Sequence, residues 1–362
     1  MYKYDNEERL LILLSRITFS EEEILEIDRL TKEKIDWNYI LLISIKNKVV
    51  ALIWNTIRKF SLITRIPRRI IQVMKFTAIG TRNRIEEYIR LAEMLGNVLE
   101  NNGIEYAFLK GSFLIPNMYK EYDMRTMNDV DIFINKSDKN RIDKLMKELG
   151  FLQGEYSENT HSVEPLSREK RIFWVSKMNN LFPYIKFADS DYINCFKVDF
   201  AFRLDVHNTE EDMTYFYAVM NTDGTLPAAY FFLHLCCHFY KEAIHLIWIY
   251  NGSDINLIKM CDILEFFRTK MTESERVEAM RLAETHGHSQ DVYYTLQCIS
   301  EIYGINYDKY ISMLSGVDKS ILDFFIGNKN QRIKWKNNIH RRIFSLNNQE
   351  EIEGQVPEYR LL

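Results

Sequence analysis

Residues 104–134, with the sequence IEYAFLKGSFLIPNMYKEYDMRTMNDVDIFI, decide the fold. The stretch begins with IEYAFL (104–109) and ends with VDIFI (130–134). Both runs are short and rich in aromatic or β-branched residues, which favour strands. A helical pattern runs between them from about Ser112 to Tyr122. The stretch therefore predicts a strand, a helix and a second strand in succession, at the centre of a mixed α/β domain.

Upstream of this stretch the pattern is helical. Ser20 and Glu23 form the signature of a capping box, and Pro67 interrupts the helical run. A long amphipathic segment from about Arg82 to Asn101 then ends at Gly103, a residue typical of the position after a helix.

Downstream, Ser137 is the expected cap of a helix that Gly150 ends. YIKF (184–187) and FKVDFAF (196–202) alternate as strands do. Beyond Pro227 the pattern becomes helical again, with a second capping box at Thr272 and Glu275 and a helix from about Ser289 to Ile302.

These patterns predict an α+β protein with a mixed sheet and helical flanks. The expected domains are a helical N-terminal region (1–102), an α/β domain (103–205), an all-helical C-terminal domain (206–345) and a polar tail (346–362). The basic run QRIKWKNNIHRR (331–342) could touch phosphates or an acidic partner, but a solvated amphipathic helix is the simpler interpretation.

Composition excludes several classes of protein. The 362 residues are 46% hydrophobic and 27% charged, which is typical of a globular chain and not of a disordered one. A formal charge of −4 provides no overall basic field for nucleic acid. The 5 cysteines contain no CxxC pair and are expected to be reduced and mostly buried. No apolar run reaches the roughly 18 residues that a membrane span needs, so we expect a cytoplasmic protein without a membrane partner.

Carboxylates mark the candidate chemistry. Asp129 and Asp131 are two apart around a strand, so both should face the same side. Asp199 lies in a later strand-like run. Clustered acids repel unless a hard divalent cation lies between them, and oxygen ligands suit Mg²⁺ bound to nucleotide phosphates. Asp205 is a rival third acid, but it follows the apolar alternation, so we favour Asp199.

A second group of residues suits phosphates. Gly111 follows a strand and precedes a helix, which permits close approach of a ligand to the backbone. Ser112 offers a hydroxyl there, and Lys110 and Arg125 are cations without an obvious acidic partner in the sequence. Each of these features alone is more often structural: Asp-x-Asp can be a solvated face and Lys-Gly-Ser an ordinary turn.

In this combination the sequence resembles the DNA polymerase beta type of nucleotidyltransferase. LKGSFL (109–114), MYKEYDMRTMNDVDIFI (118–134) and KVDFAF (197–202) are more closely similar to an uncharacterised bacterial family within that superfamily. The resemblance covers about residues 85–265 and implies the polymerase-beta-like fold.

The resemblance also implies the role of each residue. Asp129 and Asp131 bind Mg²⁺, and Asp199 completes the metal site or acts as a base. Gly111 and Ser112 hold the nucleotide phosphates, while Lys110 and Arg125 match basic positions of the family.

The chain departs from the family pattern in two places. The segment between Ser112 and Asp129 is longer than in the compact superfamily, although the closer family shares this length. Relatives often carry a histidine two residues after the third acid, where this chain has Ala201, so it uses a different substrate or His207 instead. Asp262 matches an acid of the close family that could contact nucleotide or acceptor, but a helix-surface acid is the simpler interpretation.

Other histidines and cysteines are interpreted as structural. His234 and His238 share a helix face, but Leu235 stands where a zinc protease needs glutamate, so packed histidines are expected. Cys236 and Cys237 are expected in the core, and the segment 286–288 at a helix end.

The expected activity is Mg²⁺-dependent transfer of a nucleoside monophosphate from an NTP, with ATP the first candidate. The acceptor is a small molecule or peptide, since RNA and DNA usually need a basic groove. The alternatives are protein nucleotidylylation of a toxin or antitoxin type, and a non-catalytic nucleotide-binding or scaffold protein of the same fold.

Overall fold

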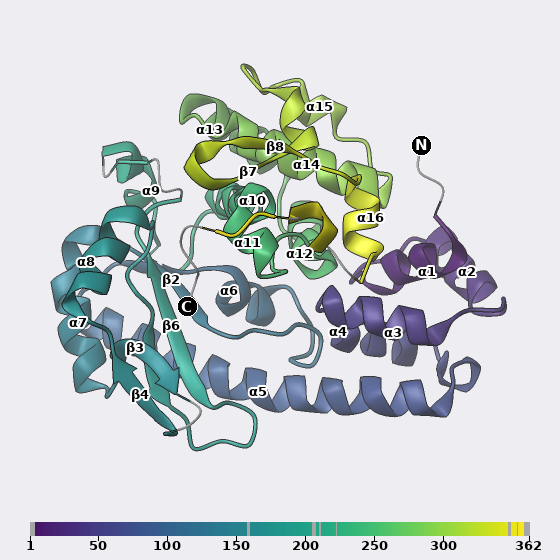
Figure 1. Cartoon of the computed structure of the whole chain (residues 1–362), viewed down its shortest axis with the longest axis horizontal. Helices are drawn as coiled ribbons and strands as arrows, with labels where there is room; N and C mark the ends of the chain where they lie inside the picture. The colour runs from purple at the N-terminus through teal and green to yellow at the C-terminus, as the bar shows by residue number, and fades with distance from the viewer. Residues whose placement is uncertain are drawn as a thin grey trace. The chain divides into compact units, whose positions relative to one another are not determined.

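The computed structural model describes residues 4–157, 160–204, 208–209, 211–221, 223–346, 349–352 and 354–357 (Figure 1). Contacts divide the chain into two compact units. The first contains the residues up to Ile79, the short segment Asp123–Arg125 and the residues from Phe232 onward. The second contains Gly80–Tyr122 and Thr126–Phe231. Each unit therefore consists of separate stretches of the chain, and the second unit begins within a helix. The ranges expected from the sequence were continuous.

The second unit is built around a six-stranded mixed sheet, which confirms the expected α+β class. Its strand order is β1-β2-β6-β5-β3-β4. The pair β2 and β6 is parallel, and the other four pairs are antiparallel. The strands are β1 (Tyr106–Phe108), β2 (Val130–Ile134), β3 (Leu152–Ser157), β4 (Ser162–Pro165), β5 (Tyr184–Phe187) and β6 (Cys195–Ala201).

The helices of this unit include the C-terminal part of α5, a single continuous helix in Figure 1. This helix begins at Arg68, well before the expected Arg82, because Pro67 precedes its first turn and Gly80 does not interrupt it. The α-helices are α5 (Arg68–Asn101), α6 (Lys110–Asn117), α7 (Lys139–Glu148), α8 (Arg168–Lys177) and α9 (Thr214–Tyr217).

One face of the sheet carries the hydrophobic core of the second unit. Val130 and Ile132 of β2 and Val198 and Phe200 of β6 belong to one buried cluster, to which α5 and α7 also contribute. Because side chains alternate along a strand, the intervening residues face the other side of the sheet. On that side Phe133 packs against Phe216 of α9, with ring centroids 4.8 Å apart.

Two local expectations in this unit are wrong. The helix expected from Ser112 to Tyr122 is α6, which begins two residues earlier and ends at Asn117, with Pro116 in its last turn. Ser137 is not a helix cap: Asn135 accepts its backbone N–H and opens a short 3₁₀ turn that leads into α7. Asparagine competes with serine for such capping positions.

The first unit is mainly helical. Both expected capping boxes, Ser20 with Glu23 and Thr272 with Glu275, are confirmed. Its α-helices are α1 (Asn6–Leu14), α2 (Glu21–Leu30), α3 (Trp37–Lys46), α4 (Val50–Lys59), most of α10 (Ala228–Ile244), α11 (Leu246–Tyr250), α12 (Leu257–Thr269), α13 (Glu273–Thr285), α14 (Ser289–Tyr303), α15 (Asp308–Ile311) and α16 (Ile339–Phe344).

The expectation of an all-helical C-terminal domain is wrong. Strands β7 (Phe324–Ile326) and β8 (Arg332–Lys334) form an antiparallel hairpin, so the basic run 331–342 is not one amphipathic helix. Trp335 packs on Phe325, with centroids 4.6 Å apart, in a small buried cluster. The expected polar tail is also partly buried, since Ile352 joins this cluster. Burial of apolar side chains therefore determines the structure of the run 331–342, whose positive charge had suggested a solvated helix.

Candidate functional site

The parallel pairing of β2 and β6 brings two candidate acids together. Asp131 and Asp199 are register partners on these neighbouring strands. Both lie opposite the hydrophobic cluster, because Val130 and Ile132, and likewise Val198 and Phe200, point into that cluster. Asp129 directly precedes β2, two residues before Asp131. The carboxylates that the sequence separates by up to 70 residues thus meet at one place on the sheet.

The electrostatics of the site reflect this proximity. Burial, together with the negative charges of Asp129 and Asp199, raises the pKa of Asp131 to about 7 against the opposing charge of Lys110. Burial is also the main cause that raises the pKa of Asp199, to which Asp129 contributes. Burial and a neighbouring negative charge both disfavour the ionised form of a carboxyl group. Raised pKa values of this kind are typical of functional carboxylates.

Two nitrogen donors hold the two paired carboxylates. Lys110 Nζ donates to Asp131 Oδ1 over 2.8 Å. Asn180 Nδ2 donates to Asp199 Oδ1 over 2.7 Å. Asn180 is held in turn, because Trp174 Nε1 donates to its side-chain oxygen over 3.2 Å and its backbone bridges to Ala201. Asn180 and Trp174 were not identified from the sequence, since no motif places them beside Asp199.

Hydrogen bonds connect the turn Leu109–Ser112 to β2. The backbone N–H of Leu109 donates to Asp131 O over 3.0 Å. The hydroxyl of Ser112 accepts the backbone N–H of Asp131 over 3.1 Å, and the side chain is buried. Lys110 between them has a positive φ of 44°, unusual for a residue with a side chain. Ser112 thus positions Asp131, a contact that the sequence did not predict; its expected role toward phosphates stays a prediction.

Asp129 is placed by helix α5. The hydroxyl of Tyr88 donates to the backbone oxygen of Asn128 over 2.6 Å. Arg84 Nε donates to the backbone oxygen of Met127 over 3.1 Å. Both bonds fix the segment directly before Asp129, so a buried helix of the core sets the position of this acid.

Arg125 belongs to the first unit, together with its partner Asp262. Arg125 Nε donates to Asp262 Oδ1 over 2.9 Å and Arg125 Nη2 to Asp262 Oδ2 over 2.7 Å. The sequence interpretation of Arg125 as a cation without an acidic partner is therefore wrong, and so is that of Lys110, which pairs with Asp131. Asp262 is likewise not a surface acid, since it is only 3% exposed.

The oxygen donors of Asp129, Asp131 and Asp199 fit Mg²⁺, a hard cation that binds carboxylates. In the described part of the chain, however, only one trio of candidate metal ligands has all its ligand atoms within 4.8 Å, and it lies elsewhere. The carboxylate oxygens of the three aspartates therefore do not all lie within 4.8 Å of one another. Asp131 and Asp199 each accept a hydrogen bond from a nitrogen donor instead. A divalent cation would compete with the Lys110 ammonium for Asp131, and its two positive charges would favour the ionised acids.

A cavity of about 640 Å³ in the second unit does not include these acids. Its lining includes Phe196 of β6 and Arg90 and Leu91 of α5. Phe196 packs against the hydrophobic cluster, so this cavity lies on the opposite face of the sheet from Asp199.

Other candidates from the sequence have separate outcomes. Asp205 and His207 lie outside the described residues. His234 and His238 stack on α10 with centroids 6.1 Å apart, and His238 Nε2 lies 3.3 Å from Glu242. Since His234 is 5% exposed, the interpretation of packed histidines is confirmed for it.

Comparison with known proteins gives one family. A family model described as "Uncharacterised nucleotidyltransferase" matches residues 33–304, a wider range than the resemblance in the sequence motifs. The match covers both the carboxylate site and much of the helical first unit. Comparison with curated proteins and with solved structures finds no match. Among the described residues, no helix has the length and apolar character needed to cross a membrane.

Proposed function

Because the chain belongs to the uncharacterised nucleotidyltransferase family, we propose that it transfers a nucleoside monophosphate from an NTP to an acceptor with release of pyrophosphate. ATP is the first candidate for the NTP, and Mg²⁺ is the proposed metal. The acceptor we favour is a small molecule or a peptide, since the net charge of −4 offers nucleic acid no overall attraction.

The observation that carries the proposal is the register of Asp131 and Asp199 across two parallel strands. A purely structural role would not require three acids to be brought together against their mutual repulsion. The raised pKa of Asp131, about 7, means that the ionised form is held at a cost in free energy. Such a cost is expected where charge serves function.

Asp129, Asp131 and Asp199 are the residues that would hold Mg²⁺. The bound cation would stabilise negative charge on the phosphates. Lys110 supplies a further positive charge next to Asp131, from which its ammonium can turn to a phosphate oxygen. Gly111 would contribute a backbone N–H at the start of α6. Ser112 keeps Asp131 in place through its hydroxyl.

Asp199 is the proposed general base. Burial raises its pKa, which makes it a stronger base than an ordinary carboxylate. The acceptor oxygen or nitrogen loses its proton to Asp199 and forms a bond to the α-phosphorus, while the bond from that phosphorus to the β-phosphate oxygen breaks. Pyrophosphate leaves with the electron pair of the broken bond, and the proton passes from Asp199 to solvent.

Nucleotide binding is tested by titration calorimetry with ATP in Mg²⁺ and in excess chelator. The proposal expects binding in Mg²⁺ that is lost in chelator and weakened in Asp131→Asn. Equal affinity in both conditions would contradict the carboxylate metal site. Binding without any transfer would favour the non-catalytic alternative, and label transferred to a protein would favour protein nucleotidylylation.

A further inference from the structure

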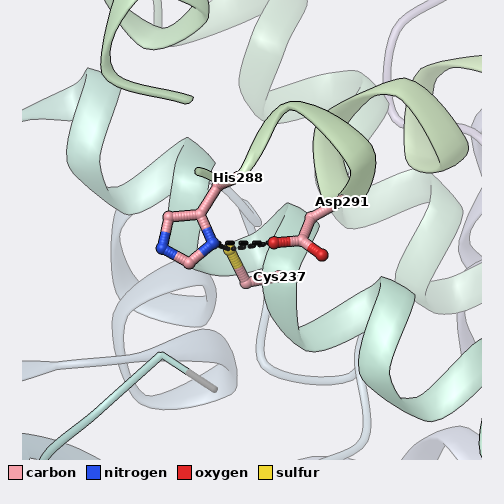
Figure 2. A group of neighbouring side chains, drawn as sticks. All are labelled: Cys237, His288 and Asp291. Atoms are coloured by element: carbon pink, nitrogen blue, oxygen red, sulfur yellow. Dashed lines mark hydrogen bonds and ion pairs between the residues drawn. The ribbon is translucent and has the colours of Figure 1, made fainter. Parts of the chain in front are cut away.

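In the first unit a cysteine meets a histidine and an aspartate that lie more than 50 residues further along the chain. Cys237 lies on α10, His288 directly precedes α14, and Asp291 lies in the first turn of α14. Figure 2 shows the thiol, one ring nitrogen and one carboxylate oxygen turned toward one another. Cys237 Sγ lies 3.5 Å from His288 Nδ1 and 3.4 Å from Asp291 Oδ2. His288 Nδ1 lies 2.7 Å from Asp291 Oδ2.

All three side chains are buried. Cys237 is 1% exposed, His288 4% and Asp291 7%. The other ring nitrogen of His288, Nε2, is buried without a hydrogen-bond partner among the described residues. It points away from the trio (Figure 2). The hydrogen-bonding contacts of this imidazole are therefore on its Nδ1 side, which orients that nitrogen toward Cys237 and Asp291.

These separations are close to those around a tetrahedral zinc ion. With Zn–S near 2.3 Å and Zn–N or Zn–O near 2.0 Å, the ligand atoms of such a site lie about 3.3–3.5 Å apart. The two distances from Cys237 Sγ match this value. The distance between His288 Nδ1 and Asp291 Oδ2 is shorter by about half an ångström, so these two atoms would move apart when the ion binds.

The donor chemistry also suits this ion. Thiolate, imidazole and carboxylate are the three kinds of side-chain ligand that Zn²⁺ takes. A thiolate and a carboxylate carry two negative charges, so a divalent ion leaves the buried site neutral. Burial of an uncompensated charge would be costly.

We propose that Cys237, His288 and Asp291 bind one Zn²⁺ ion, which fastens α10 to the beginning of α14. Binding takes the proton from the Cys237 thiol and releases it to solvent, while the Nδ1 proton of the neutral His288 ring moves to Nε2, so that the imidazole stays neutral. The fourth coordination position is left to a non-protein ligand. The site is separate from the carboxylates of the second unit, and its occupation does not depend on nucleotidyl transfer.

A hydrogen-bond network is the competing explanation of the trio. In that case the Cys237 S–H and the His288 Nδ1–H both donate to Asp291 in the first turn of α14. The two explanations differ in what happens when a thiophilic metal is added. A network without metal affinity leaves the stability of the protein unchanged, whereas a zinc site gains stability that rises with the zinc concentration.

The experiment uses the full chain in millimolar Mg²⁺, so that the oxygen ligands of the second unit are saturated. Zn²⁺ is added, the protein is passed through a desalting column, and zinc is measured by mass spectrometry. Co²⁺ is then substituted as a spectroscopic probe. We expect one zinc per chain, a charge-transfer absorption band from thiolate to cobalt, and a melting temperature that rises with Zn²⁺ and falls in chelator.

The matched variants are Cys237→Ser and Cys236→Ser, which alter neighbouring buried thiols on one helix. Cys237→Ser should lose the cobalt band and weaken zinc binding more than tenfold, while Cys236→Ser keeps both. Should Cys237→Ser fail to fold, His288→Gln and Asp291→Asn provide the same comparison. Absence of retained zinc and of the band in the unaltered protein, or a band that survives Cys237→Ser, would overturn the proposal.

Discussion

Asp131 on β2 and Asp199 on β6 are directly paired neighbours in a parallel register. Their side chains share the face of the sheet that lies opposite the hydrophobic cluster, and each accepts a hydrogen bond from a different nitrogen donor. The pairing makes the two acids depend on one another electrostatically. The predictions below follow from this relationship and from the residues that maintain it.

Asp131→Asn should stabilise the metal-free protein at high pH. The pKa of Asp131 in the folded state, about 7, lies above the ordinary value of 3.8, so the folded state binds this proton more tightly than the unfolded state does. The free energy of unfolding therefore falls as the pH rises through this range, and the loss is complete above about pH 7. Asparagine removes this titration. Chemical denaturation in chelator should show a difference between variant and parent that grows by about 1–3 kcal/mol from pH 5 to pH 8.

Asp129→Asn provides the matched comparison. Its charge is the second cause of the raised pKa of Asp131, so its removal should reduce the pH dependence of stability without abolishing it. A stability difference between Asp131→Asn and the parent that is the same at both pH values would show that Asp131 does not titrate in this range.

Asn180→Ala should move the acidic limb of the pH–rate profile to higher pH. The hydrogen bond from Asn180 lowers the pKa of Asp199, so its loss lets burial raise that pKa further. The maximal rate should fall by about 10–100-fold, as is usual for residues that hold a functional group in place. Trp174→Phe removes only the bond to Asn180 and should change the profile in the same direction by less. An acidic limb that stays in place in Asn180→Ala would remove Asn180 from this role.

Ser112→Ala should destabilise the fold more than it weakens nucleotide binding. The variant leaves the buried backbone N–H of Asp131 without its acceptor, which costs about 1–3 kcal/mol. Urea denaturation measures the loss, and calorimetry with ATP measures affinity. Ser312→Ala, at an exposed position, should change stability by less than about 0.5 kcal/mol. Unchanged stability with lost ATP affinity would instead assign the hydroxyl to the phosphates.

Arg125→Met should destabilise the first unit, because it leaves the buried carboxylate of Asp262 without its cation. Loss of one partner of a buried ion pair costs about 3–5 kcal/mol. The double variant Arg125→Met/Asp262→Leu should recover much of this stability. The ATP affinity of the double variant then answers the second question. Retained affinity confines both residues to a structural role, whereas lost affinity in a stable protein supports a contact of Arg125 or Asp262 with the nucleotide.

Local sequence patterns predicted the strands of the site well. VDIFI and YIKF form β2 and β5 with the expected ends, and KVDFA lies within β6. Alternation alone placed Asp131 and Asp199 on the strand faces opposite the apolar residues that enter the hydrophobic cluster. The pairing of β2 with β6 is a long-range contact, and the motif resemblance, rather than periodicity, related the two acids.

The remaining contacts could not be predicted because they depend on packing between distant segments. Asn180 lies outside the regular strands and is placed beside Asp199 by an isolated backbone bridge to Ala201. Arg125 pairs with Asp262, which is 137 residues away. The hairpin of β7 and β8 has strands of three residues each, too short to show alternation within a basic run. Burial of Trp335 against Phe325 decides that structure.

Transfer of labelled nucleotide tests the central claim most directly. The purified protein is incubated with Mg²⁺ and each NTP labelled at the α-phosphorus, with small-molecule and peptide fractions of a cell extract as acceptors, and pyrophosphate and labelled products are measured. The account predicts pyrophosphate release coupled to labelling of an acceptor, abolished in chelator and in Asp131→Asn. Transfer that persists undiminished in a folded Asp131→Asn variant would contradict it.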